Sequence, residues 1–151
     1  AAWRSIYHIV THTVHPAAPA FAGHLEDFAA VCRVVGGMRR LTVGAIGART
    51  TAFKTVRFDE LTLQKHGITT EVVDLSEVML RVRGLKPSDP RVKAKAARLK
   101  AYTTWKGVPA EALGTLSKLG VVLDGLIAEY KMDAMSLRCW IELEKDLRVS
   151  P

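Results

Sequence analysis

The chain has 151 residues, about the length of one domain, and 48% of them are hydrophobic while 25% are charged. This composition is typical of a globular protein and excludes disordered, collagen-like and disulfide-scaffold chains. The 22 Lys and Arg residues outnumber the 15 Asp and Glu residues, and the resulting net charge of +7 favours anionic partners. The basic residues are nevertheless dispersed, and aromatic residues are too few to stack on bases, so we expect no nucleic-acid partner. The densest basic stretch comprises Arg91, Lys93, Lys95, Arg98 and Lys100.

The apolar segments and the cysteines indicate the kind of environment in which the chain works. No apolar run approaches the roughly 20 residues that cross a bilayer, so we expect no membrane span. The N-terminal residues have no secretory signal pattern. Cys32 and Cys139 are fewer cysteines than a small oxidised scaffold carries, which favours a reduced, cytoplasmic protein. Cys32 lies on the apolar face of a predicted helix, and we expect it to belong to the core.

The first 23 residues form a segment of their own in this interpretation, and residues 24–151 form the α/β domain. Residues 6–14 are rich in Thr, Val and His, which predicts a short strand before a proline-rich linker over 16–19. His8, His12 and His15 would share a helical face, but an extended chain turns His15 to the opposite side, so we expect no metal site.

Alternating helical and strand patterns follow along residues 24–84. A helix of about 14 residues is predicted from the apolar spacing of Leu25, Phe28, Ala29, Cys32 and Val35, with Gly36-Gly37 as its end. Residues 41–47 read as a strand buried on both faces. Thr50 or Thr51 is predicted to cap a helix that carries Phe53, Val56, Leu61 and Leu63 and ends near His66-Gly67. Residues 68–73 form a second predicted strand, and Asp74 or Ser76 starts a helix that ends at Gly84.

The second half of the chain continues the alternation. Residues 86–90 predict a turn, residues 91 to about 105 a charged helix, and residues 107–109 a break. The next helix has an apolar stripe of Leu116, Leu119, Val122, Leu123, Leu126, Ile127 and Tyr130. Residues 133–140 form a third predicted strand, and residues 141–147 a final helix. This order predicts a layered α/β domain with a mainly parallel sheet.

In such domains, ligands bind beyond the carboxyl ends of the strands. The rule selects two loops, Gly47 to Thr50 after the first strand and Arg138 to Trp140 at the end of the last. Gly47 allows close backbone approach, a helix beginning near Thr51 offers free N–H groups, and Arg49 adds a positive charge, so an anionic or hydroxyl-rich ligand would fit. The alternative is that Gly44 and Gly47 only permit tight packing. The dinucleotide-binding glycine signature is absent.

Several blocks of the chain resemble L-fucose isomerase-like proteins of the fucose and arabinose isomerase superfamily. The blocks run from Arg33 through the segment Val43-Gly44-Ala45-Ile46-Gly47-Ala48-Arg49 to Phe58, then over 63–68, 73–77, 133–134 and 138–140, and together cover roughly residues 24–148. The resemblance implies a three-layer, Rossmann-like middle domain of an enzyme that interconverts aldoses and ketoses. It also implies a divalent metal, commonly Mn²⁺, and a homo-oligomer.

The resemblance also implies residues that this sequence does not contain. An acidic, Cys-Glu-x-Asp-like block should follow the Arg-Cys-Trp block, and a metal-binding histidine should lie in a later domain. We therefore expect the chain to be excised from a longer protein whose remaining domains are its partners, and we expect no metal ligand here.

Four residues are carried over as substrate-binding candidates, Arg49, Arg138, Cys139 and Trp140, and Glu142 is the nearest carboxylate for acid–base catalysis. For each, a structural role is the alternative. Glu142 would then be an exposed first-turn carboxylate, and Trp140 an anchor between sheet and helix. Cys139 has no histidine partner and would be an inert buried thiol.

These residues and the resemblance leave two candidate functions open. The first is a domain of a metal-dependent sugar isomerase, in which this chain shapes the sugar pocket and the subunit contacts. The second is a non-catalytic module that binds a sugar or an anion.

Overall fold

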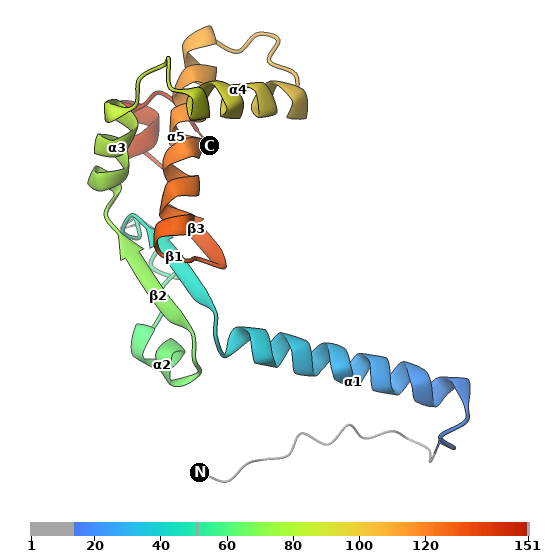
Figure 1. Ribbon diagram of the computed structural model, residues 1–151. Coiled ribbons are helices and arrows are strands. Elements are labelled where there is room, and N and C mark those ends of the chain that lie inside the picture. The colour runs from blue at the N-terminus through green and yellow to red at the C-terminus, as the bar shows by residue number, and fades with distance from the viewer. Residues whose placement is uncertain (1–13, 51, 151) are drawn as a thin grey trace. The chain divides into compact units, whose positions relative to one another are not determined.

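The computed structural model describes residues 14–50 and 52–150 (Figure 1). Contacts divide the chain into two units, of which the first ends at Gly37 and the second begins at Met38. Helix α1 (Pro19–Met38) accounts for most of the described part of the first unit. Of the strand predicted over 6–14, only Val14 belongs to the described residues. His8 and His12 also lie outside them.

Helix α1 is longer than the sequence indicated, because it starts at Pro19 and continues through Gly36 and Gly37. Proline is well suited to a first helical turn, where its missing N–H would be unpaired in any case. Neither glycine adopts a positive φ, so the pair weakens the helix without ending it. The expectation that Cys32 is a core residue is wrong, because Cys32 is exposed and α1 has no buried residue.

The second unit is built on a three-stranded parallel sheet in the order β2-β1-β3. The strands are β1 (Thr42–Ile46), β2 (Thr69–Val73) and β3 (Ala134–Leu137). In the register of the sheet, Gly44 lies between Glu71 and Met135. The predicted α/β class with a parallel, Rossmann-like sheet is therefore confirmed, although β3 is shorter than the predicted 133–140.

Five helices accompany the sheet: α2 (Glu60–Lys65), α3 (Leu75–Gly84), α4 (Pro90–Tyr102), α5 (Ala110–Glu129) and α6 (Glu142–Asp146). Aspartates set three of their starts, because the carboxylates of Asp59, Asp74 and Asp89 accept hydrogen bonds from first-turn N–H groups. Proline follows Asp89 as the first residue of α4. The predicted bounds of α3 agree with the structure, whereas α4 ends three residues before the predicted 105.

The helix predicted to start at Thr50 or Thr51 is wrong in its first half. Helix α2 begins only at Glu60, because Asp59 accepts hydrogen bonds from the N–H groups of Leu61 and Thr62 at 3.0 and 3.1 Å. Phe53 and Val56 lie instead in turns between β1 and α2. Gly67 ends this segment with φ of +84°, and a Cβ there would come within 2.2 Å of the Arg39 carbonyl oxygen.

The core joins the sheet to α3, α5 and α6. It contains Ile46, Val73, Leu75, Val78, Val82, Leu119, Val122, Leu126, Met132 and Leu143. The core residues of α5, Leu119, Val122 and Leu126, lie three and four positions apart, which places them on one helical face. Met132 lies against Gly44, where a Cβ would approach the Met132 sulfur to 2.3 Å. A bulkier residue at position 44 would therefore displace the turn between α5 and β3.

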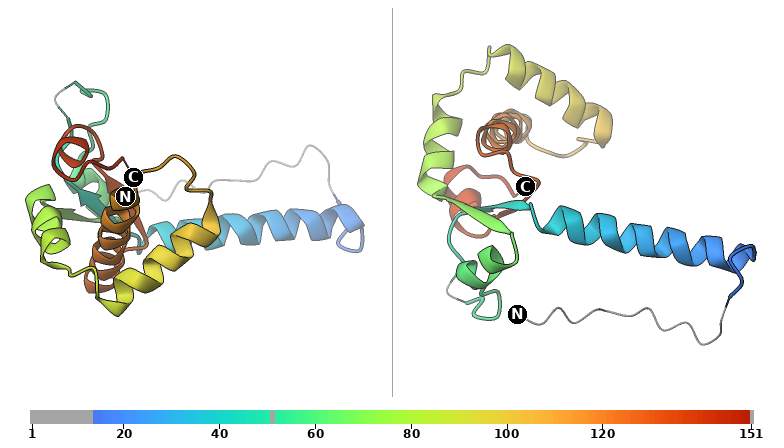
Figure 2. Two further views of the ribbon diagram at one scale, coloured as in Figure 1. Left: turned by 90° about the horizontal axis from the view of Figure 1, so that it is seen from above. Right: turned by 60° about the horizontal axis from the view of Figure 1, so that its bottom comes forward.

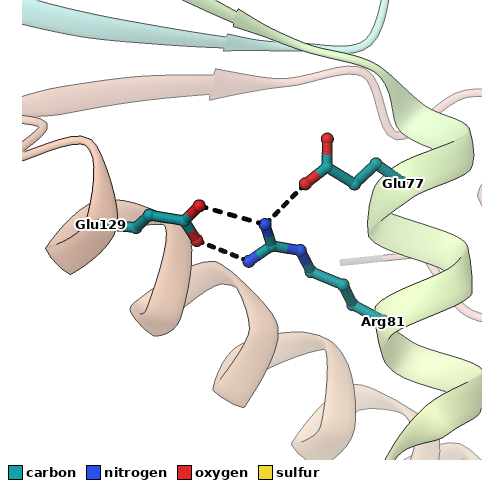
Figure 3. Close-up of polar contacts among 3 residues, drawn as sticks. All are labelled: Glu77, Arg81 and Glu129. Carbon is teal, nitrogen blue, oxygen red and sulfur yellow. Dashed lines mark hydrogen bonds and ion pairs between the residues drawn. The ribbon is translucent and has the colours of Figure 1, made fainter.

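A cluster of charges at the surface joins α3 to α5 (Figure 3). The Arg81 guanidinium donates to Glu77 at 2.6 Å and to Glu129 at 2.7 Å. Hydrogen bonding to Arg81 lowers the pKa of Glu129, and the two carboxylates raise the pKa of Arg81. Arg83 and Asp146 form a further ion pair between α3 and α6. These contacts tie three helices together outside the apolar core.

None of the helices within residues 14–50 and 52–150 has both the length and the apolar character needed to cross a bilayer.

Candidate functional site

A cavity of about 520 Å³ opens at the carboxyl ends of β1 and β3, within the size range of small-molecule sites. We name it the strand-end cavity. It is lined by Ala45, Ile46, Gly47, Ala48, Arg49, Thr50, Phe53, Val56, Phe58, Ser136, Leu137, Arg138, Cys139 and Trp140. The structure thus brings together the two loops that the sequence selected, the loop after β1 and the loop after β3.

Gly47 sets the path of the first loop. Its φ is +81°, in the left-handed region, and its N–H donates to the Val73 carbonyl at 2.8 Å. A Cβ at position 47 would lie 2.9 Å from the Cβ of Arg138. Only glycine therefore lets the two loops approach this closely, which agrees with the tight-packing role that was the alternative.

Arg49 and Thr50 continue this loop along the cavity. The Arg49 guanidinium donates to the Thr50 carbonyl at 3.0 Å, and Thr50 is buried. Within residues 48–50 and 52–59 no helix begins, and α2 begins at Glu60, so the helix N-terminus expected at this loop is not found there. The free amide groups and helix dipole proposed for this loop are therefore withdrawn, and its positive charge comes from Arg49.

Arg138 and Glu142 form an ion pair next to the cavity. The Arg138 Nη2 donates to Glu142 Oε1 at 2.6 Å, while the Arg138 backbone N–H donates to the Ile46 carbonyl at 2.8 Å. Arg138 Nε and Glu142 Oε2 are enclosed, and neither has a hydrogen-bond partner among the described residues. The pair therefore contains one buried donor and one buried acceptor whose hydrogen-bonding capacity is unused among the described residues.

Glu142 lies in the first turn of α6, as in its structural alternative, but it is half-buried and not exposed. It is not among the lining residues of the strand-end cavity, and it reaches that cavity through Arg138. The residue before it, Ile141, has φ of +71°, which marks a sharp turn between Trp140 and α6. This turn brings the Glu142 side chain back to Arg138, four positions earlier.

Cys139 and Trp140 complete the second loop. Cys139 is a half-buried free thiol. Trp140 is half exposed, and its indole contacts the ring of Phe53 with 4.8 Å between ring centroids. The Phe53 contact links the two loops through their aromatic side chains.

Phe53, Val56 and Phe58 are cavity residues that the sequence interpretation missed. Helical spacing had assigned Phe53 and Val56 to the buried face of a helix. Asp59 was the available signal, since an Asp before a Glu-Leu-Thr-Leu segment is a strong N-cap and leaves the preceding residues in a loop.

The charged side chains that line the strand-end cavity, within the described residues, are both arginines, Arg49 and Arg138. No group of three or more His, Cys, Asp or Glu side chains in the described part of the chain is arranged to hold a metal ion. Two guanidinium groups disfavour a divalent cation at this place. The cavity therefore fits a hydroxyl-rich or anionic ligand, and its donor set does not fit Mn²⁺.

No protein-family model matches the chain, and no curated protein matches it significantly.

Proposed function

We propose that this chain supplies the sugar-binding pocket of a metal-dependent aldose–ketose isomerase that acts on an L-fucose-like or L-arabinose-like aldose. The observation that carries the proposal is the strand-end cavity, which combines arginine side chains with aromatic rings. A sugar ring has a polar edge of hydroxyl groups and an apolar face of C–H groups. Guanidinium donors suit the edge, and an aromatic side chain such as Trp140 suits the face.

Isomerisation also requires a group that moves a proton between C1 and C2 of the sugar. Glu142 is joined to a cavity residue by its ion pair with Arg138, and its Oε2 has no hydrogen-bond partner among the described residues. In the proposal, Glu142 takes the proton from C2 to give an enediol, the hydroxyl proton passes from O2 to O1, and Glu142 returns its own proton to C1. Arg138 lines the cavity and orients Glu142 by donating from Nη2 to Oε1.

The divalent ion of such an enzyme, commonly Mn²⁺ in the family that the sequence resembles, polarises the carbonyl and hydroxyl oxygens of the substrate when bound. The residues of the strand-end cavity do not fit it, so the proposal places its ligands outside this cavity. The sequence resemblance extends the proposal to further domains and to a homo-oligomer, with the reduced cytoplasm as the setting.

The second candidate is a module that binds a sugar or an anion without turnover. It is favoured by the state of Glu142, whose carboxylate is held by Arg138 and does not line the cavity. For this module, Arg49, Arg138, Cys139 and Trp140 remain the binding residues, and Glu142 becomes a structural partner of Arg138.

The experiment that separates the two candidates measures ketose formation and sugar binding together. L-Fucose and L-arabinose are supplied with and without Mn²⁺ to the longest natural polypeptide that contains this sequence, and binding to the chain itself is measured by calorimetry. Mn²⁺-dependent ketose formation supports the isomerase. Saturable binding without ketose formation supports the module, and absence of both overturns the proposed function.

A further inference from the structure

A second cavity lies between α4 and α5 and shares no lining residue with the strand-end cavity. Helix α4 packs against α5, and the two helices lie next to each other in both views of Figure 2. This helix cavity, as we name it, has a volume of about 350 Å³. It is lined by Arg91, Ala94, Lys95, Arg98, Val121, Asp124 and Gly125.

The three cations come from a single face of α4. Arg91, Lys95 and Arg98 are spaced four and three residues apart, which places them in one row along a helix. This row faces α5, whereas Lys100 of the same helix does not line the cavity. The densest basic stretch of the sequence is therefore more than a dispersed charge, because three of its residues line an open groove beside α5.

Lys95 is built into the wall of the helix cavity. Its stem lies across Gly120 of α5, where a Cβ would approach the Lys95 Cδ and Cγ to 3.1 and 3.2 Å. The side chain is only 16% exposed, and its ammonium pairs with Asp124. On the same helix, Gly125 has open space where a Cβ would stand. Glycines at 120 and 125 thus admit the lysine stem and leave room beside it.

The charges of the helix cavity do not cancel. Arg91 is neutralised by Asp89 at 2.8 Å, and Lys95 by Asp124. The guanidinium of Arg98 has no ion pair or hydrogen bond with any residue that the structure describes. One positive charge is left over. A smaller cavity of about 160 Å³ shares Arg91, Val121 and Gly125 with it and adds Arg81 of α3, whose charge is balanced by Glu77 and Glu129.

We propose that the helix cavity binds a small phosphate-type anion, with Arg98 as its principal partner and Lys95 and Arg91 as the flanking cations. Guanidinium and ammonium groups form charge-assisted hydrogen bonds to phosphate oxygens. The enclosure between two helices suits a compact phosphate group. A nucleic-acid backbone would instead follow an extended basic surface and would use Lys93 and Lys100 equally. The site is independent of the sugar-binding proposal.

The test is calorimetric titration of the whole chain with inorganic phosphate at constant ionic strength. We expect one saturable site in the millimolar range or tighter. Arg98→Ala should weaken it about tenfold, because a hydrogen bond between charged groups is lost. Lys100→Ala removes the same charge from the same helix outside the cavity, and it should change the affinity less than about twofold.

A second pair of variants tests the volume of the cavity without altering any charge. Gly125→Leu places a side chain in the open space and should abolish phosphate binding. Gly114→Leu makes the same exchange in α5 outside the helix cavity and should leave binding unchanged. Equal losses from Arg98→Ala and Lys100→Ala, unchanged binding by Gly125→Leu, or a single-stranded RNA that competes more tightly than phosphate would each overturn the proposal.

Discussion

The indole ring of Trp140 lies against the phenyl ring of Phe53, with 4.8 Å between the centroids and 37° between the ring planes. Phe53 belongs to the segment after β1 and Trp140 to the loop after β3, so the contact joins segments far apart in the sequence. Both residues line the strand-end cavity. The pair therefore forms an aromatic wall against which the apolar face of a ligand can pack.

The aromatic wall gives a first prediction. In a double-mutant cycle with Phe53→Ala and Trp140→Ala, we expect a coupling of about 0.5–1.5 kcal/mol in the free energy of unfolding, because tilted aromatic pairs contribute this much beyond area burial. Each single variant should also weaken sugar binding. Additive unfolding free energies, or unchanged affinity in both single variants, would contradict the role assigned to the wall.

Gly47→Ala should destabilise the second unit by about 1–2 kcal/mol, since the left-handed backbone disfavours a Cβ. The cost rises further because that Cβ meets Arg138 at 2.9 Å. Gly114→Ala is the matched control, as it lies in open space inside α5 and should stabilise by about 0.5–1 kcal/mol. Chemical denaturation measures both variants. If Gly47→Ala were as stable as the wild type, the close approach of the two loops would be wrong.

Glu142→Gln separates the catalytic role of this carboxylate from its structural role. The ion pair with Arg138 is partly exposed, at 24% for Arg138 and 40% for Glu142, so its loss should lower the unfolding free energy by less than about 1 kcal/mol. If Glu142 moves the substrate proton, kcat of the isomerase should fall by about 100-fold or more, with little change in sugar affinity. A kcat that stays within threefold of the wild type would assign Glu142 to structure alone.

The cap of α3 predicts a pH dependence of stability. Hydrogen bonds from the hydroxyl and the backbone N–H of Ser76 lower the pKa of Asp74 below its ordinary value. The folded state thus binds this proton less readily than the unfolded state, whose Asp pKa is about 3.9. The stabilisation is fully present above that value and is lost as the pH falls through the folded pKa.

Asp74→Asn removes the titratable carboxyl group but keeps a side-chain oxygen that can cap the helix. Thermal unfolding between pH 2 and 6 should show a smaller acid-induced decrease in Tm for the variant than for the wild type. Asp59 and Asp89 also have lowered pKa values, through Thr62 and Arg91 respectively, so part of the decrease should persist. Identical pH profiles for variant and wild type would show that Asp74 contributes nothing to the acid-induced decrease in Tm.

Local signals in the sequence were sufficient for much of the fold. The bounds of α3 followed from Asp74 and Gly84, and the strands from short β-branched or apolar runs. Cys32 shows where such signals fail, because spacing identifies an apolar face and does not say what covers it. The helix prediction after Thr50 was wrong for a related reason, since Phe53, Val56 and Phe58 face a cavity and not a helical interface.

The candidate site could be predicted at the level of loops but not of contacts. The rule for parallel sheets selected Gly47 to Thr50 and Arg138 to Trp140. The hydrogen bond from Arg138 to Ile46 depends on β1 pairing with β3, and no local pattern encodes that pairing. The ion pair of Arg138 with Glu142 depends on the turn at Ile141, whose positive φ is unusual for a β-branched residue.

The central claim is that the strand-end cavity binds a sugar. The most direct measurement is an NMR titration of the isotopically labelled chain with L-fucose and with L-arabinose, following backbone amides and the Trp140 indole. We predict saturable shifts for at least one sugar, confined to Gly47 to Thr50, Phe53 and Arg138 to Trp140, and reduced by Trp140→Ala. Shifts that do not saturate, or that lie elsewhere in the chain, would contradict the claim.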